Sequence, residues 1–164
     1  MILYHPKSFN MLDQKMKSQA LRRRRTLKVK VSPNLDSLEF LIGKLKEQIE
    51  EVGAIAVFTG VVRGTRGAEK VLRLEYEAHE DLAVESMKKI IEETKAKYGI
   101  IDAMIQHRLG AAKVGEDVMY VLVASKHRAE AFQALSEIVE RVKHEVPIWK
   151  KEITEKKSYW VENL

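Results

Sequence analysis

Hydrophobic positions along the chain follow two different periods, and the change of period divides the sequence into strands and helices. Apolar residues at every second position predict half-buried strands, and apolar residues three and four positions apart predict amphipathic helices. The expected strands span residues 26–31, 53–62, 71–78, 100–110, 117–125, 147–154 and 158–162. The expected helices span residues 36–51, 81–98 and 127–145. This order predicts an α+β domain with about three helices, but it does not determine which strands pair.

Turn-forming residues separate these elements. The Gly-rich charged stretch at 63–70 and the sequence "AAKVGE" at 111–116 are expected to be connections, because glycine and charged residues are typical of exposed turns. Gly99 follows the second helix, where a glycine commonly ends a helix in the left-handed conformation. The "EKK" segment at 155–157 should turn the chain between the last two strands. Those strands are therefore expected to form a hairpin.

The composition is that of one soluble globular domain. The chain has 164 residues, of which 45% are hydrophobic and 32% charged, so it can bury a sizeable core. No apolar run approaches the ~20 residues that a membrane span requires, and no secretory signal pattern is visible. Cysteine is absent, which excludes disulfides, thiolate metal sites and a cysteine nucleophile carried by this chain. A cytoplasmic location without a membrane partner is expected.

The net charge of +5 is unevenly distributed. Residues 1–30 contain nine lysines and arginines but one acid, whereas the rest of the chain contains 20 basic and 23 acidic residues. We therefore divide the chain into a basic N-terminal extension, residues 1–25, and a mildly acidic domain, residues 26–164. The extension could be a poorly ordered solvated tail, the product of an upstream start codon, or an arm that binds a partner or nucleic acid. The acidic domain argues against a nucleic-acid-binding protein.

The motifs of the common metal and nucleotide sites are missing. The five histidines include no pair four residues apart, and no HExxH or DxD sequence occurs. The glycine-rich sequences of dinucleotide and P-loop sites are absent, as is the GxSxG of serine hydrolases. No metal site and no bound cofactor are therefore expected.

Three basic residues stand out at the ends of predicted elements. Arg63 follows a buried strand at the start of the Gly-rich stretch, a place where functional side chains often lie. Lys143 falls in the last turn of the third helix. Lys150 lies on the next strand, where alternation directs it to the opposite face from Trp149 and Lys151. Taken singly, each has an ordinary explanation, such as an arginine paired with a carboxylate or a lysine that complements a helix dipole.

The start of the third helix is a further candidate site. Ser125 is expected to cap this helix and to place His127 and Arg128 in its first turn. Free backbone N–H groups and two cationic side chains there would suit an anion. Solvent exposure of both side chains would explain the pattern equally well.

Several of these stretches occur together in one known family. The sequences "GAIAVFTGVVRG", "LEYEA", "HRLG", "VGEDVMYVLVASKHRAEAF" and "VKHEVPIWKKE" resemble, in order and spacing, the large catalytic subunit of molybdopterin synthase. The resemblance covers about residues 27–162 and implies a single-domain α/β hammerhead-like fold with a mixed and antiparallel sheet. It further implies a homodimer in which each copy binds one small ubiquitin-like sulfur-carrier subunit. In the implied reaction, sulfur passes from the thiocarboxylate on the Gly-Gly tail of the small subunit to cyclic pyranopterin monophosphate, and two transfers form the dithiolene of molybdopterin.

The resemblance also implies which residues form the site. The matching positions are Lys143 and Lys150 for the catalytic lysines and Phe58, Arg63, His127 and Arg128 for the substrate pocket. Such cationic groups suit an anionic phosphate and an anionic thiocarboxylate. Lys143 is expected to polarise the thiocarboxylate or to engage it covalently, and Lys150 to act as a general acid–base or to stabilise an oxyanion. A lysine in such a cationic cluster should have a lowered pKa.

Helix geometry limits how these residues can meet. His127 and Lys143 are separated by about 24 Å on a continuous helix, at ~1.5 Å per residue. We therefore expect a composite pocket. Arg63, Lys143 and Lys150 would come from one subunit, and His127 and Arg128 from its dimer mate.

The sequence departs from the family pattern near its C-terminus. Family members often carry a further arginine after the "WVE" segment, where this chain reads "VENL". Arg66, Lys70 or Lys151 could replace it. A second interpretation is therefore a non-catalytic relative that binds a ubiquitin-like partner, although the intact lysines argue against it. A third interpretation is a nucleic-acid-binding module that uses the basic arm.

Overall fold

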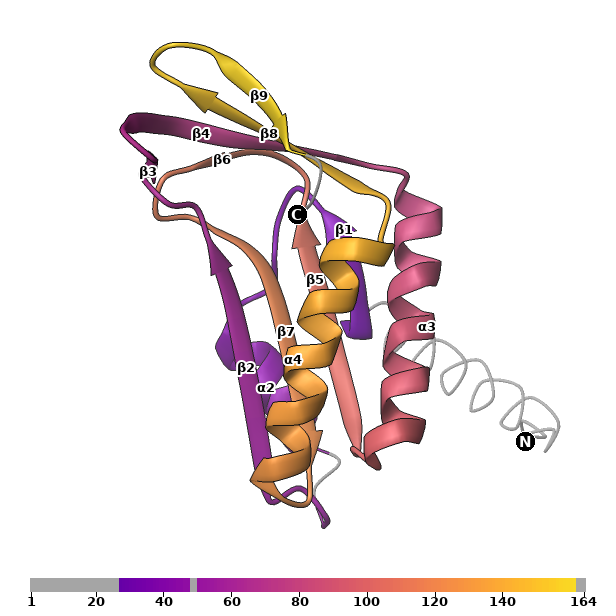
Figure 1. Ribbon diagram of the computed structural model, residues 1–164. Helices are drawn as coiled ribbons and strands as arrows, with labels where there is room; N and C mark the ends of the chain where they lie inside the picture. Colours follow the sequence, from indigo (N-terminus) through magenta and orange to yellow (C-terminus); the bar gives the residue numbers. More distant parts are fainter. Residues whose placement is uncertain (1–26, 48–49, 162–164) are drawn as a thin grey trace, which may run out of the picture.

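The computed structural model describes residues 27–47 and 50–161, and these form an α+β domain with three helices (Figure 1). The helices are α2 (Leu38–Lys46), α3 (Glu80–Tyr98) and α4 (Arg128–Glu145). The strands are β1 (Val29–Ser32), β2 (Ala54–Val61), β3 (Thr65–Arg66), β4 (Glu69–Ala78), β5 (Asp102–Arg108), β6 (Gly110–Lys113), β7 (Asp117–Ser125), β8 (Ile148–Thr154) and β9 (Ser158–Val161). The predicted fold class and number of helices are confirmed. Within the described ranges, no helix is long and apolar enough to span a membrane.

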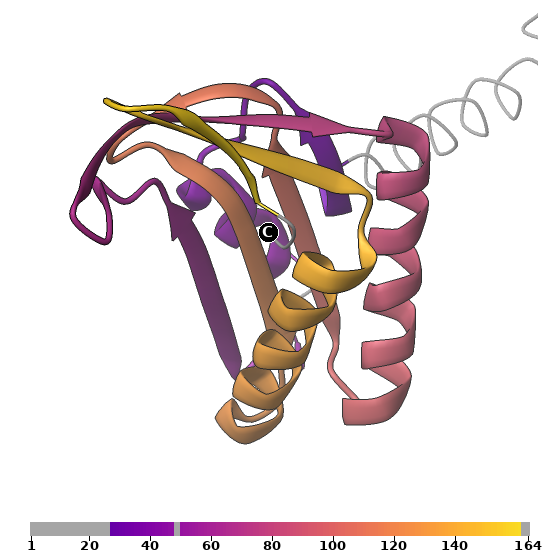
Figure 2. The same cartoon turned by 45° about the horizontal axis from the view of Figure 1, so that its top comes forward.

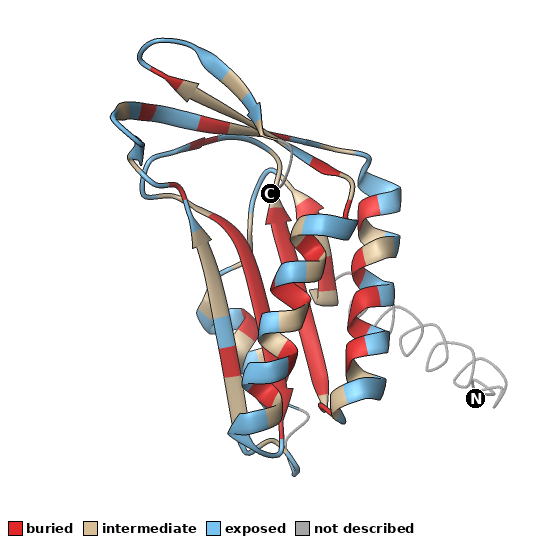
Figure 3. Ribbon diagram, in the orientation of Figure 1, coloured by how far each residue is buried: buried red, intermediate tan, exposed pale blue. Residues whose placement is uncertain are grey.

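The main sheet has the strand order β1-β5-β7-β2 and is covered by helices on both faces. Only the β1–β5 pair is parallel, and the other two pairs are antiparallel. Strand alternation divides the buried residues of β5 and β7 between the faces. Ile105 and Val121 belong to the core cluster that also includes residues of α3 and α4, whereas Met104 and Leu122 belong to the cluster that includes α2. Burial on both faces explains the near-continuous apolar sequence of β7, whereas the equally buried β5 also contains the polar residues Asp102, Gln106 and His107 (Figure 3).

A second sheet lies across one end of the main sheet, as the tilted view shows (Figure 2). Its central strand, β4, pairs with β8 and also with β6 and β3, and β8 pairs with β9. The β8–β9 pair is the hairpin that the sequence predicted. The register places Tyr76 of β4 directly opposite Lys150 of β8. This pairing determines which side chains face the main sheet.

Several predicted boundaries were wrong. The first strand begins at Val29 rather than at residue 26, and α2 ends at Lys46 rather than at residue 51. The two glycine-containing connections each contain a short strand, β3 and β6, because β4 offers both of them backbone hydrogen bonds. The basic extension, residues 1–25, lies outside the described residues.

Ser125 does not cap α4. It is the last residue of β7, pairs with Ala54 of β2 and is buried. The N-cap residue is His127, whose side chain makes no capping hydrogen bond with the described part of the chain, and Arg128 is the first helical residue. The strand ends at Ser125 as predicted, but α4 begins only at Arg128, so Ser125 lies too far from the helix to cap it. In contrast, Gly99 ends α3 as predicted, with a φ of 65° and a bond from its N–H to the carbonyl of Lys95.

Gly53 and Gly43 provide a matched test of the packing at the start of β2. A Cβ on Gly53 would lie 2.2 Å from the carbonyl oxygen of Lys126, whereas nothing lies within 4 Å of a Cβ on Gly43 in α2. We expect Gly53→Ala to lower the free energy of unfolding by roughly 1–3 kcal/mol, because backbone must move to admit the methyl group. Gly43→Ala should raise it by about 0.5–1 kcal/mol through helix propensity. Urea titration measures both, and equal effects would contradict this account.

Candidate active site

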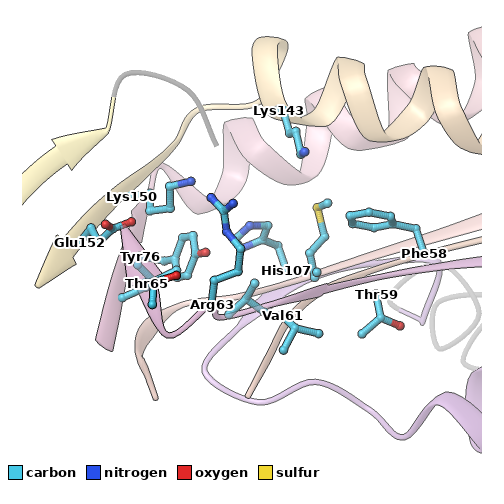
Figure 4. Close-up of a pocket in the computed structure, with 14 residues that line it drawn as sticks. Phe58, Thr59, Val61, Arg63, Thr65, Tyr76, His107, Lys143, Lys150 and Glu152 are labelled. Carbon is cyan, nitrogen blue, oxygen red and sulfur yellow. The ribbon is translucent and has the colours of Figure 1, made fainter. Parts of the chain in front are cut away.

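A cavity of about 430 Å³ lies where the main sheet, the second sheet and the C-terminal end of α4 meet (Figure 4). The main sheet and the segment after β2 supply Phe58, Arg63, His107 and Met119, the second sheet supplies Tyr76, Lys150 and Glu152, and α4 supplies Lys143. Four of these eight side chains are among the six predicted site residues. The two sheets therefore bring together groups that are far apart in the sequence.

Three cations reach the cavity from three different elements. Arg63 follows the end of β2, Lys143 lies in the last turn of α4, and Lys150 lies on β8. The ammonium of Lys143 lies 5.9 Å from the centre of the Phe58 ring, which is within the range of a cation–π contact. None of the three forms a salt bridge with a carboxylate of the described residues, so the ordinary explanation of Arg63 as a carboxylate-paired loop residue does not hold there. These charges are available to an anionic ligand.

The two adjacent lysines of β8 face opposite sides of the second sheet. Lys150 and Glu152 line the cavity, whereas Trp149 is 51% exposed on the outer face. The ammonium of Lys151 lies 5.6 Å from the ring of Trp160 on the neighbouring strand. Strand alternation therefore separates the lysine pair as predicted.

Burial and neighbouring charges both act on Lys150. Burial lowers the pKa of its ammonium, and the charge of Glu152 partly opposes this effect. The nearby cations Lys143, Arg63 and Arg66 lower the pKa of Lys150 further. A larger fraction of Lys150 is thus uncharged at a given pH than for an exposed lysine, which favours proton transfer.

Two buried residues at the base of the cavity were not among the predicted site residues. His107, at the end of β5, contacts the ring of Tyr76 edge-on, with 4.9 Å between the ring centres. Burial lowers the pKa of His107 to about 4, against the opposing effect of its hydrogen bond to the Arg108 carbonyl, and the charge of Lys150 lowers it further. Burial and the charge of Glu152 raise the pKa of Tyr76 well above its ordinary value. Both rings are therefore neutral at physiological pH.

Glu152 was also missed, and it brings Arg66 to the edge of the site. A carboxylate oxygen of Glu152 lies 3.5 Å from the guanidinium of Arg66, which also stacks 4.2 Å from the centre of the Tyr159 ring. Lys70 instead pairs with Glu155 at an exposed position. Of the three residues proposed to replace a C-terminal arginine, Arg66 is the one whose charge affects Lys150.

His127 and Arg128 do not line the cavity of the same chain. They lie at the start of α4, whereas Lys143 lies in the last turn of this continuous helix. Both residues are exposed. The separation predicted from helix geometry is therefore observed, and the cavity of one chain holds four of the six predicted residues.

The buried imidazole of His107 predicts a pH dependence of stability. With a folded-state pKa of about 4 and an ordinary value of 6.5, the unfolded state binds more protons between these pH values. Stability should therefore decrease as the pH falls below 6.5, with a contribution from His107 of about 3 kcal/mol once the pH is below 4. Urea titrations of wild type and His107→Gln at several pH values measure this. The variant should lose less stability on acidification, and parallel curves would contradict the assignment.

Comparison with known proteins gives a consistent result. Residues 34–145 match the family model described as "MoaE protein". The chain is 43% identical over 110 residues to the molybdopterin synthase catalytic subunit of Pyrococcus abyssi. The aligned region covers 67% of this chain and 74% of the relative. The crystal structure of molybdopterin synthase from Staphylococcus aureus has a TM-score of 0.73 and 33% identity, and the match covers 83% of this chain and 96% of that one.

A second solved structure is the complex of subunits 1 and 2 of the molybdopterin-converting factor from Helicobacter pylori. Its matched chain has a TM-score of 0.66 and 25% identity, covering 82% of this chain and 90% of that one. The family match spans more than half of the sequence and includes Phe58, Arg63, the His127–Arg128 pair and Lys143. Lys150 follows it, on the strand that completes the cavity. The chain belongs to the MoaE protein family.

Proposed function

We propose that this chain is the catalytic subunit of a molybdopterin synthase. In this role it transfers sulfur from the thiocarboxylated C-terminus of a small ubiquitin-like subunit to cyclic pyranopterin monophosphate. The observation that carries the proposal is the cavity with three cations, Arg63, Lys143 and Lys150, that have no carboxylate partner within salt-bridge distance among the described residues. Membership of the family supports the same reaction.

The charges of the cavity suit both reactants. The substrate carries a phosphate and the tail of the small subunit ends in a thiocarboxylate, so two anions must be held close together. An arginine can bind phosphate oxygens in a bidentate way, whereas a lysine offers a point charge that can approach a single atom. We assign Arg63 to the phosphate and the two lysines to the reacting groups. The absence of cysteine from the chain is compatible with this scheme, because the sulfur arrives on the partner.

The two lysines are assigned different tasks. Lys143 lies beside Phe58 at the end of a helix, and its charge would polarise the incoming thiocarboxylate. Lys150 has the lowered pKa, so its amine would act as the general acid–base when sulfur leaves the tail. In its charged form, Lys150 would stabilise the negative charge that develops on the carbonyl oxygen of the tail during the transfer.

The complete site would need a second copy of the chain. His127 and Arg128 are exposed at the far end of α4. In a homodimer, this pair of one subunit would reach the cavity of its mate and add two donors for the phosphate. Each cavity would also admit the tail of one small subunit, giving an assembly of two large and two small subunits.

Single alanine substitutions of Lys143 in α4 and of Lys150 and Lys151 in β8 test the assignment with a built-in control. Lys143→Ala and Lys150→Ala should each lower molybdopterin formation roughly 100-fold or more, because each removes a charge or proton donor from the reaction. Lys151→Ala, on the opposite face of β8, should retain turnover close to that of wild type. The assay combines the protein with thiocarboxylated small subunit and cyclic pyranopterin monophosphate and measures molybdopterin. Unchanged turnover in Lys143→Ala would refute its role, and a wild-type protein that binds the small subunit but forms no product would favour a non-catalytic relative.

Mixing two inactive variants tests the composite site. In a dimer of one Lys143→Ala subunit and one Arg128→Ala subunit, one cavity carries both defects and the other carries neither. Random exchange of subunits should therefore restore about a quarter of wild-type activity in an equimolar mixture, since half of the dimers are mixed. Each variant alone serves as the control. If the mixture stays inactive although mass spectrometry shows that subunits have exchanged, both residues act within one chain.

A further inference from the structure

His107 is a cavity residue that the proposed sulfur transfer leaves without a task. It is 2% exposed, lies at the end of β5 and lines the cavity with Lys150 and Tyr76. Its Nδ1 atom lies 2.8 Å from the carbonyl oxygen of Arg108. A carbonyl oxygen can only accept, so Nδ1 must carry the hydrogen. This contact selects one neutral tautomer, in which Nε2 has a free lone pair.

The surroundings keep the imidazole in that neutral form. Burial lowers the pKa of His107 to about 4, and the positive charge of Lys150 acts in the same direction. The edge-on contact with Tyr76 limits rotation of the ring. Among the described residues, no side chain or backbone group forms a hydrogen bond with Nε2. A ligand can therefore use this atom as an acceptor.

The other polar groups of the cavity differ from His107 in what they can accept. In their charged forms, Arg63, Lys143 and Lys150 can donate hydrogen bonds but cannot accept them. Hydroxyl groups such as that of Tyr76 can rotate to donate or to accept, and the Glu152 carboxylate faces the guanidinium of Arg66. Nε2 of His107 can only accept, and it does so without adding charge. The cavity thus combines an anion-binding edge with a fixed neutral acceptor.

We propose that His107 is a specificity residue, whose Nε2 accepts a hydrogen bond from a neutral N–H or O–H group of the substrate while Arg63 holds its phosphate. This inference rests on the proposed function. A reduced pterin offers ring N–H and hydroxyl donors, whereas a simple inorganic anion such as sulfate offers none. Three cations alone would bind any small anion of suitable size. Nε2 adds a requirement for a donor at one position, because a buried acceptor or donor left unpaired costs free energy.

Three substitutions separate this role from simple packing. The amide oxygen of glutamine can reach the position of Nε2, so His107→Gln keeps an acceptor there. Asparagine is shorter, so His107→Asn can keep the bond to the Arg108 carbonyl but leaves the Nε2 position empty. His107→Phe keeps a flat ring beside Tyr76 and removes both nitrogen atoms. Thermal unfolding of each variant identifies those that fold.

We expect catalytic efficiency to fall only in the variants that lack a hydrogen-bond acceptor at the position of Nε2. In the molybdopterin assay, kcat/KM should fall roughly 10- to 100-fold in the asparagine and phenylalanine variants and stay within about 5-fold of wild type in the glutamine variant. Isothermal titration should show the same order of affinities for cyclic pyranopterin monophosphate. The affinity for inorganic sulfate should be unchanged in all three, because the cations remain.

Two results would overturn the proposal. One is wild-type kcat/KM in folded His107→Asn. The other is an equal loss in the asparagine and glutamine variants together with weaker sulfate binding, which would show that His107 only supports the shape of the cavity. If wild-type protein forms no molybdopterin, the proposed function fails instead.

Nitrogen-15 NMR of histidine-labelled wild-type protein gives a test that needs no variant. The Nε2 resonance of His107 should have the shift of an unprotonated ring nitrogen and should move upfield when cyclic pyranopterin monophosphate is added. Addition of sulfate should leave it in place. A resonance that does not respond to the bound substrate would also overturn the proposal.

Discussion

The pairing of β7 with β5 on one side and with β2 on the other is the interaction on which both the core and the cavity depend. Hydrogen bonds along these two ladders bring the ends of β2, β5 and β7 together at one end of the main sheet. Phe58, His107 and Met119 lie near that end of the sheet, and Arg63 comes shortly after the last residue of β2. The buried faces of the same strands hold α3 and α4 on one side and α2 on the other. A change that weakened this sheet would therefore also displace the residues that line the cavity.

The second sheet completes the cavity because its antiparallel strands β4 and β8 lie across that end of the main sheet. Their register places Tyr76 opposite Lys150, and alternation directs both toward the main sheet. An ammonium group is thereby partly buried among other cations, which lowers the pKa of Lys150 and helps to keep His107 neutral. The free energy to bury these like charges must come from the packing of both sheets. An anionic ligand would relieve the repulsion, which is a physical reason for such a site to bind anions well.

Helix α4 connects two distant groups of basic residues. Its last turn presents Lys143 to the cavity, and its first turn presents Arg128 to solvent. A straight helix cannot bring both ends to one small ligand, at ~1.5 Å per residue. Within one chain, the His127–Arg128 pair therefore lies away from the cavity, and the proposed dimer would supply this pair from the second copy.

The local pattern of the sequence was sufficient for the elements and for part of the site. Periodicity located the three helices and the C-terminal hairpin, and alternation separated Lys150 from Lys151, because both depend on neighbours within a few residues. The cap at Ser125 was mispredicted, since Ser125 pairs with Ala54 of β2 and α4 begins only at Arg128. His107, Tyr76 and Glu152 were missed as site residues for a related reason. Each has an ordinary strand context, and it is the crossing of the two sheets that brings them to the same cavity. The sequence alone determined which face of each element is apolar and which residues are charged. The tertiary structure decided which of them meet, because strand pairing over long sequence separations sets both the distances and the local polarity.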